Sequence, residues 1–186
     1  MPGCVITNPV LLSNCITSTG GVYTVYVAGH VKNTVFGKST GNLINGYDST
    51  ALGGTLAFKE IQQDIEIANA TDPSTGTRSS GTVSYAPGIT LTIVYGKDPA
   101  ANDLIRTTLI ELSKGNLIVI VKENSGIHRM YGKENGLRMV TTAGGTGTSF
   151  DDLNGIVMTL AGKETEPASI IDLTTTPQAP MVAFGL

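Results

Sequence analysis

One stretch of this 186-residue chain combines the capping residues and the apolar stripe of an amphipathic helix, and most of the rest has the patterns of strands and loops. Asp98 is a favourable N-cap residue, and Pro99 fits the first helical position, where its missing N–H costs nothing. Lys114 complements the C-terminal dipole, and Gly115 follows as the C′ residue. The apolar stripe between them consists of Leu104, Ile105, Thr108, Leu109 and Leu112. The pattern predicts a helix over 99–114 that covers one apolar face of a sheet or barrel.

The composition favours a mainly β protein around this helix. Charged residues make up 15% of the chain, against a usual share of about 25%. The chain has 23 glycines and no tryptophan, and low charge with abundant Gly and Thr is typical of strands and tight turns. Residues 22–27 are rich in β-branched and aromatic side chains and predict a strand. Residues 117–121 are apolar on both faces and predict a central strand.

A long hairpin is predicted between the first strand and the helix. Its first arm, 56–69, alternates apolar and polar residues, with a change of phase between Phe58 and Ile61 that predicts a bulge. A helix is the alternative for this arm. Segment 70–81 is polar and rich in turn residues, so it is the expected loop, and 81–96 alternates again as the returning arm.

The remaining segments complete a β-sandwich or barrel domain over 21–162, flanked by an N-terminal arm over 1–20 and a C-terminal arm over 163–186. A long Gly-rich loop is expected at 144–155. The C-terminal arm ends apolar, so it either packs on its own domain or docks on a neighbouring subunit. Further strands are predicted at 127–131, 137–141 and 156–160, with turns at 123–126 and 133–136.

The sequence lacks the spacing that known catalytic and cofactor sites require, so no enzymatic activity, cofactor or metal is expected. His30 and His128 are interpreted as exposed strand-end residues, because no Gly-x-Ser-x-Gly nucleophile motif accompanies them. Residues 151–154 resemble part of a calcium loop but lack its closing glutamate, which favours an Asx turn. The glycine run 143–148 has neither the lysine nor the following helix of a phosphate-binding loop.

Charge and hydropathy limit the partners. The net charge is −3, with a sequence pI near 5.3 and no basic tail, so an electrostatic grip on nucleic acid is not expected. No apolar run is long enough for a membrane helix, and the N-terminus does not have the pattern of a signal peptide, which predicts synthesis in the cytoplasm. Cys4 and Cys15 are interpreted as free thiols of a reducing compartment, with a disulfide as the alternative.

Acidic residues recur in the first arm of the predicted hairpin, at Glu60, Asp64 and Glu66. Because i and i+2 share one face of a strand, Asp64 and Glu66 lie side by side in this reading. The common explanation is a solvated strand face, and a pair of carboxylates for acid–base chemistry is another. A third is an acidic stripe that faces a channel and lets DNA pass without binding.

Three groups of segments resemble virion proteins of tailed phages that infect Bacteroides-type hosts, including the crAss-like group. They are Gly20–Ala28, Tyr131–Leu137, and Asp151–Gly155 together with Gly162–Pro167. The arrangement of strands, one long hairpin, one flanking helix and apolar arms resembles phage tail-tube proteins. The resemblance implies a subunit of a homo-oligomeric ring, usually hexameric, that stacks into a tube in the virion tail and contacts other tail and neck proteins. DNA would pass through it transiently, without a membrane partner.

Two other functions stay open at this point. A neck or portal-proximal connector ring, of twelve subunits for instance, or a capsid-decorating protein would also be structural. A receptor- or glycan-binding module is less consistent with 5% aromatic residues and no tryptophan. Subunit contacts are expected at the hairpin, the Gly-rich loop and the apolar arms, and the candidate interface residues are Arg78, Phe150, Ile170, Ile171, Val182 and Phe184.

Overall fold

The computed structural model describes residues 20–32, 34–38, 43–48, 56–63, 68–77, 82–146, 153–174, 181–184 and 186. Strands account for 51% of them, arranged in several sheets. The single helix of this part of the chain is α1 (Pro99–Ser113). The prediction of a mainly β protein with one helix is therefore confirmed.

The larger sheet has eight strands, and β9 (Leu117–Glu123) lies near its middle between β1 (Val22–Gly29) and β10 (His128–Tyr131). Beyond β1 the sheet ends with β4 (Lys59–Gln62). Beyond β10 come β13 (Ser169–Ile171), β3 (Ile44–Asp48) and then β14 (Met181–Val182), with β2 (Phe36–Lys38) also paired to β3. All neighbours are antiparallel except β13 and β3.

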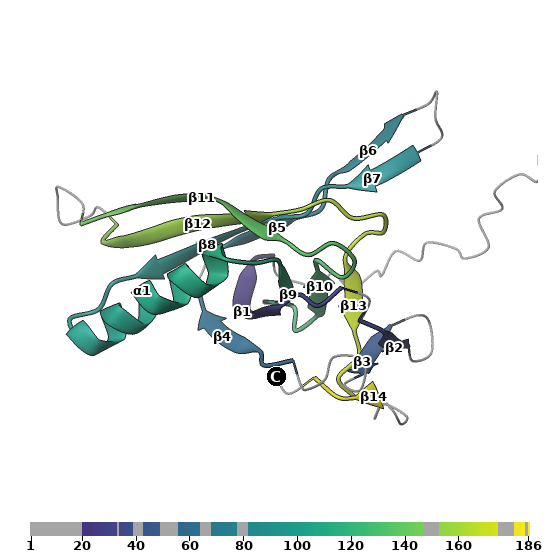
Figure 1. The fold of residues 1–186 in the computed structure, drawn as a ribbon, viewed down its shortest axis with the longest axis horizontal. Helices are drawn as coiled ribbons and strands as arrows, with labels where there is room; N and C mark the ends of the chain where they lie inside the picture. The colour runs from purple at the N-terminus through teal and green to yellow at the C-terminus, as the bar shows by residue number, and fades with distance from the viewer. Residues whose placement is uncertain are drawn as a thin grey trace, which may run out of the picture.

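The second sheet has four antiparallel strands in the order β11 (Arg138–Gly145), β12 (Gly155–Ala161), β8 (Gly88–Val94) and β5 (Asn69–Thr71). It lies above β1, β9 and β10 in Figure 1, and α1 runs beneath one end of it. A separate two-stranded hairpin, β6 (Ser74–Thr77) and β7 (Thr82–Tyr85), projects from the opposite end of the molecule.

Two apolar clusters lie on the two faces of β9, which explains its run of apolar residues. Val119 and Val121 pack in the cluster between the two sheets, against Leu91 and Met158 among others, and Leu112 of α1 joins them. On the other face, Ile118 and Ile120 pack with residues of β3, β13 and the C-terminal segment. This confirms the prediction of a central strand, because β9 is covered on both faces.

The helix begins and ends as the sequence predicts. Asp98 is the N-cap, its carboxylate accepts a hydrogen bond from the Ala100 N–H at 3.0 Å, and Pro99 is the first helical residue. The apolar stripe is covered less than expected, since Leu112 is its one buried residue and Leu104 is 66% exposed. Part of the helix face therefore lies open beside the four-stranded sheet.

The prediction of one long strand over 56–69 is wrong. Lys59–Gln62 pairs with β1 in the larger sheet, whereas Asn69–Thr71 pairs with β8 in the smaller one. The chain changes sheets between β4 and β5. The apolar residues change phase because Phe58 packs against the second cluster of the larger sheet and Ile61 against the cluster between the two sheets. The polar segment expected as a loop contains most of β5 and all of β6. The arms of the actual hairpin therefore run from Asn69 to Thr77 and from Thr82 to Val94.

The C-terminal segment, predicted as an arm with two alternatives, packs on its own domain where the structure describes it. It supplies β13 and β14 to the larger sheet, and the Phe184 ring is buried in that sheet's second cluster. The strand before the Gly-rich loop continues to Gly145, so the loop begins slightly later than expected. The N-terminal arm lies almost wholly outside the described residues.

Candidate functional site

The four-stranded sheet has an exposed edge. Strand β11 is outermost, and every residue of its eight except Met139 is exposed. Its sequence contains no proline and no charge after Arg138, although natural proteins commonly protect edge strands with such residues. A register shift between Met139 and Thr141 interrupts the pairing with β12 once, and the ladder then continues to Gly145. An edge of this kind offers unpaired backbone groups to another strand.

The same sheet has a second edge, at β5, and an uncharged outer face between the two edges. Cross-strand pairing aligns Thr141, Thr159, Thr90 and Asn69 in one row across the four strands. These side chains point away from the core because their neighbours in the strands, such as Ile89 and Leu160, point into it. Arg138 is the one charged residue of these four strands. The face is therefore polar but nearly without charge.

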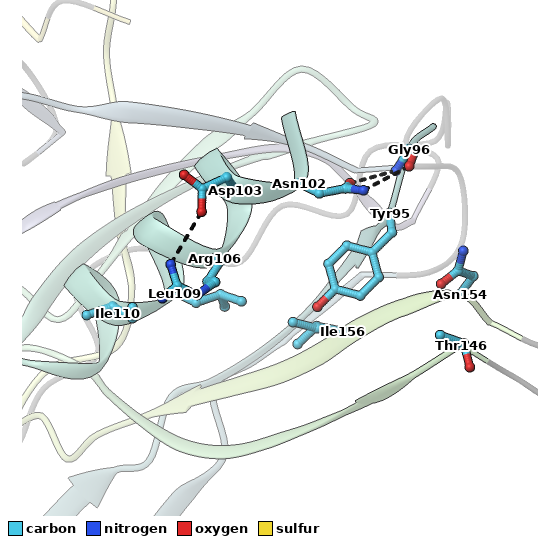
Figure 2. Close-up of a pocket in the computed structure, with 10 residues that line it drawn as sticks. All are labelled: Tyr95, Gly96, Asn102, Asp103, Arg106, Leu109, Ile110, Thr146, Asn154 and Ile156. Atoms are coloured by element: carbon cyan, nitrogen blue, oxygen red, sulfur yellow. Dashed lines mark hydrogen bonds and ion pairs between the residues drawn. The ribbon is translucent and has the colours of Figure 1, made fainter. Parts of the chain in front are cut away.

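An open groove lies between α1 and the sheet end that carries Tyr95 and Ile156 (Figure 2). Its volume is about 730 Å³. Leu109 and Ile110 of α1 form the opposite wall, and Ile110 is 42% exposed. Leu109 is the one residue of the helix's predicted apolar stripe that lines the groove, and polar groups lie at the rim.

The structure places one member of the predicted acidic stripe. Glu60 lies on β4, opposite Tyr26 of β1, and therefore belongs to the larger sheet. Burial, followed by the nearby Glu60 carboxylate, raises the pKa of Tyr26. Asp64 and Glu66 lie outside the described residues, so the stripe as a whole stays a prediction.

The candidate interface residues fall into three groups. Ile171 and Phe184 are buried in the chain's own second cluster, where their side chains are 6% exposed. Ile170 is 36% exposed on β13, and Val182 pairs with Tyr47 through the backbone of β14. Arg78 and Phe150 lie outside the described residues. Of the six, Ile170 is the side chain that the structure shows at the surface.

The histidines flank strands as expected but are half-buried rather than exposed. The Nε2 atom of His30 is buried without a hydrogen-bond partner in the described part of the chain. Burial, with the nearby Lys122 charge, lowers the pKa of His128. Among the described residues, no group of three or more His, Cys, Asp or Glu side chains is placed to hold a metal ion.

A buried carboxylate that sequence reasoning did not single out holds one turn in place. Glu164 is 6% exposed, and its two oxygens accept the backbone N–H groups of Glu134 at 2.8 Å and Asn135 at 3.1 Å. Glu134 in turn accepts hydrogen bonds from the N–H and hydroxyl of Thr165. Glu166, two residues further on, forms an ion pair with Lys133 at 2.5 Å, and its own side chain is 58% exposed. These contacts are structural.

Tyr131 gives the protein a testable pH dependence. Burial raises the pKa of Tyr131 to about 12, with the Asp72 and Glu123 carboxylates adding to the shift and Arg129 opposing it. The folded state therefore holds the phenol proton more tightly than the unfolded state, whose tyrosine pKa is 10.0. This contribution to stability is complete below pH 10 and is lost as pH rises through about 12.

Tyr131→Phe is therefore expected to flatten the alkaline decline of the free energy of unfolding between pH 10 and 12. Urea unfolding at a series of pH values measures this. Tyr23→Phe is the matched control, because Tyr23 is 57% exposed. An unchanged slope in Tyr131→Phe would contradict the assignment.

No protein-family model matches the chain, and neither a curated protein nor a solved structure matches it. The helix that the structure describes is not long and apolar enough to cross a membrane.

Proposed function

We propose that this protein is a virion structural subunit that assembles into rings and a stacked tube of a phage tail, with a channel for DNA passage. The observation that carries the proposal is the four-stranded sheet, whose eight-residue outer strand β11 has no strand on its outer side among the described residues and whose second edge is β5. If β11 of one subunit pairs with β5 of the next, the sheets join and both edges are covered. Exposed strand edges promote uncontrolled aggregation, and a closed ring prevents it because every edge is paired.

The outer face of the sheet supports the second half of the proposal. In a ring joined through these edges, one face of every sheet lines the interior, and the threonine row lies on the face opposite the core. Arg138 is the only cation on the four strands, so the lining offers phosphate groups few favourable contacts. DNA would therefore pass without being held.

The edge contact is tested by Val140→Lys. Val140 is 57% exposed on β11, so the lysine is tolerated in the monomer but places a charge at the proposed strand–strand contact. We expect the concentration needed for assembly to rise about tenfold, equal to about 1.4 kcal/mol per contact. Light scattering measures the assembly, and negative-stain electron microscopy shows its form.

Val35→Lys is the matched control, because Val35 is 50% exposed and lies next to β2, away from the four-stranded sheet. Equal assembly of the two variants would contradict pairing through β11. A wild-type protein that stays monomeric at high concentration would overturn the proposed function itself. Rings that never stack would favour the connector or capsid-decorating alternative over a tube.

A further inference from the structure

In the part of the chain that the structure describes, the β6–β7 hairpin forms a two-stranded sheet of its own, and no third strand extends it. Its strands pair with each other from Ser74 opposite Tyr85 to Thr77 opposite Thr82, and they project away from both larger sheets (Figure 1). The hairpin is tied to the body at its base, where Tyr85 and Glu164 exchange two backbone hydrogen bonds of 2.9 Å. Val83 is 50% exposed. Because an isolated two-stranded hairpin is marginally stable at best in water, this one requires a second surface.

The groove beside α1 is a preformed surface of suitable chemistry. The side chain of Asn102 donates to the Gly96 carbonyl at 3.0 Å and accepts from the Gly96 N–H at 3.1 Å, which fixes the connection between β8 and the helix. Figure 2 shows Tyr95 and Ile156 facing the helix side chains, with Thr146 and Asn154 at the rim. The groove has an apolar floor and a polar rim. The β6–β7 hairpin matches this arrangement, because its exposed Val83 lies among threonines and serines.

The two features lie at opposite ends of the long axis of the molecule, so they cannot meet within one chain (Figure 1). We propose that the β6–β7 hairpin of one copy docks in the α1 groove of a second copy, with Val83 against the wall formed by Leu109 and Ile110. The two contacting surfaces differ, so the contact is heterologous and repeats from copy to copy, as a ring or a tube requires. The inference rests on the proposed function, to which it adds a specific subunit contact.

Charge is compatible with this docking. Residues 74–85 contain one charged residue, Arg78, and no carboxylate, so the hairpin brings no negative charge to the helix. Segment 98–114 carries three carboxylates and two cations, a net charge of −1. Asp103 and Arg106 at the rim form an exposed ion pair at 3.3 Å and leave the apolar wall uncharged.

Cross-linking tests the contact directly. In a background with Cys4→Ser and Cys15→Ser, chains with Val83→Cys are co-expressed with longer-tagged chains with Ile110→Cys, and the assembled protein is treated with a short bismaleimide. We expect a mixed dimer, identified by its mass, in at least about fivefold higher yield than for Val83→Cys with Val35→Cys, whose valine is 50% exposed elsewhere. Ile110→Asp should keep the wild-type circular dichroism spectrum and abolish the larger assemblies, because it places a carboxylate in the apolar wall.

The outcomes separate this inference from the proposed function. Rings or tubes without the mixed cross-link would overturn the docking and leave the proposed function standing. The mixed cross-link without rings or tubes would support the docking and overturn the proposed function. A monomer with no cross-link would overturn both.

Discussion

Replacing Glu164 by alanine is expected to lower the free energy of unfolding by about 3 kcal/mol, measured by urea denaturation at pH 7. The carboxylate is almost fully buried and accepts two backbone N–H groups from the turn at 133–136. Hydrogen bonds to a charged group contribute about 1.5–3 kcal/mol each, and removal of the acceptor leaves both donors without a partner. Glu164→Gln keeps one acceptor oxygen and should lie between wild type and Glu164→Ala.

The effect is expected to be large because the turn joins three distant segments. Asn135 donates its side-chain N–H to the Lys163 carbonyl at 2.8 Å, and Asn116 donates to the Asn135 carbonyl at 3.0 Å. Gly132 and Gly136, which bracket the turn, have φ values of +74° and +75°, in the region that favours glycine. Loss of Glu164 therefore loosens the start of β9, the end of β10 and the segment after β12 together.

Glu166→Ala is the matched control, since it removes a carboxylate two residues away. Glu166 pairs with Lys133, but its side chain is 58% exposed, and exposed ion pairs contribute about 1 kcal/mol or less. Equal losses in the two alanine variants would show that Glu164 does not hold the turn as its hydrogen bonds indicate.

The sequence predicts best those elements whose signals are local. The helix has an N-cap, an N1 proline and a C′ glycine, so Pro99–Ser113 follows directly from short-range rules. The strand Leu117–Glu123 is recognisable because both of its faces are buried. The buried role of Glu164 has no such signal, because a glutamate beside a turn is usually solvated and only the tertiary fold brings it to 133–136.

The sequence-based predictions are wrong where a strand has no apolar alternation or where its partner strand is distant in the sequence. Ser74–Thr77 contains only Ser, Thr and Gly, so no periodicity distinguishes it from a loop, and backbone pairing with Thr82–Tyr85 makes it a strand. Alternation over 56–69 correctly indicates extended chain at Lys59–Gln62, but it cannot say that the next strand joins another sheet. The exposed edge of β11 is also a property of the sheet order, which no local pattern encodes.

Phe184→Ala is expected to lower the free energy of unfolding by about 3–4 kcal/mol, the usual cost of removing a buried phenylalanine ring. The ring centroid of Phe184 lies 5.5 Å from that of Tyr47 and 5.9 Å from that of Phe58, and the side chain is 6% exposed. Such aromatic pairs add about 0.5–1.5 kcal/mol beyond the buried area. Chemical denaturation of dilute protein, where assembly is absent, measures the loss.

Leu173→Ala is the control from the same C-terminal segment, because Leu173 is 47% exposed and its truncation should change stability by about 0.5 kcal/mol or less. Comparison of Phe184→Ala with Leu173→Ala distinguishes packing of the C-terminal segment on its own domain from docking on a neighbouring subunit. If Phe184 belongs to the monomer core, Phe184→Ala lowers the stability of the dilute chain and affects assembly only through folding. If Phe184→Ala leaves dilute stability unchanged but prevents assembly, then the segment docks on a neighbouring subunit, and the C-terminus joins β11 and the hairpin as a subunit contact.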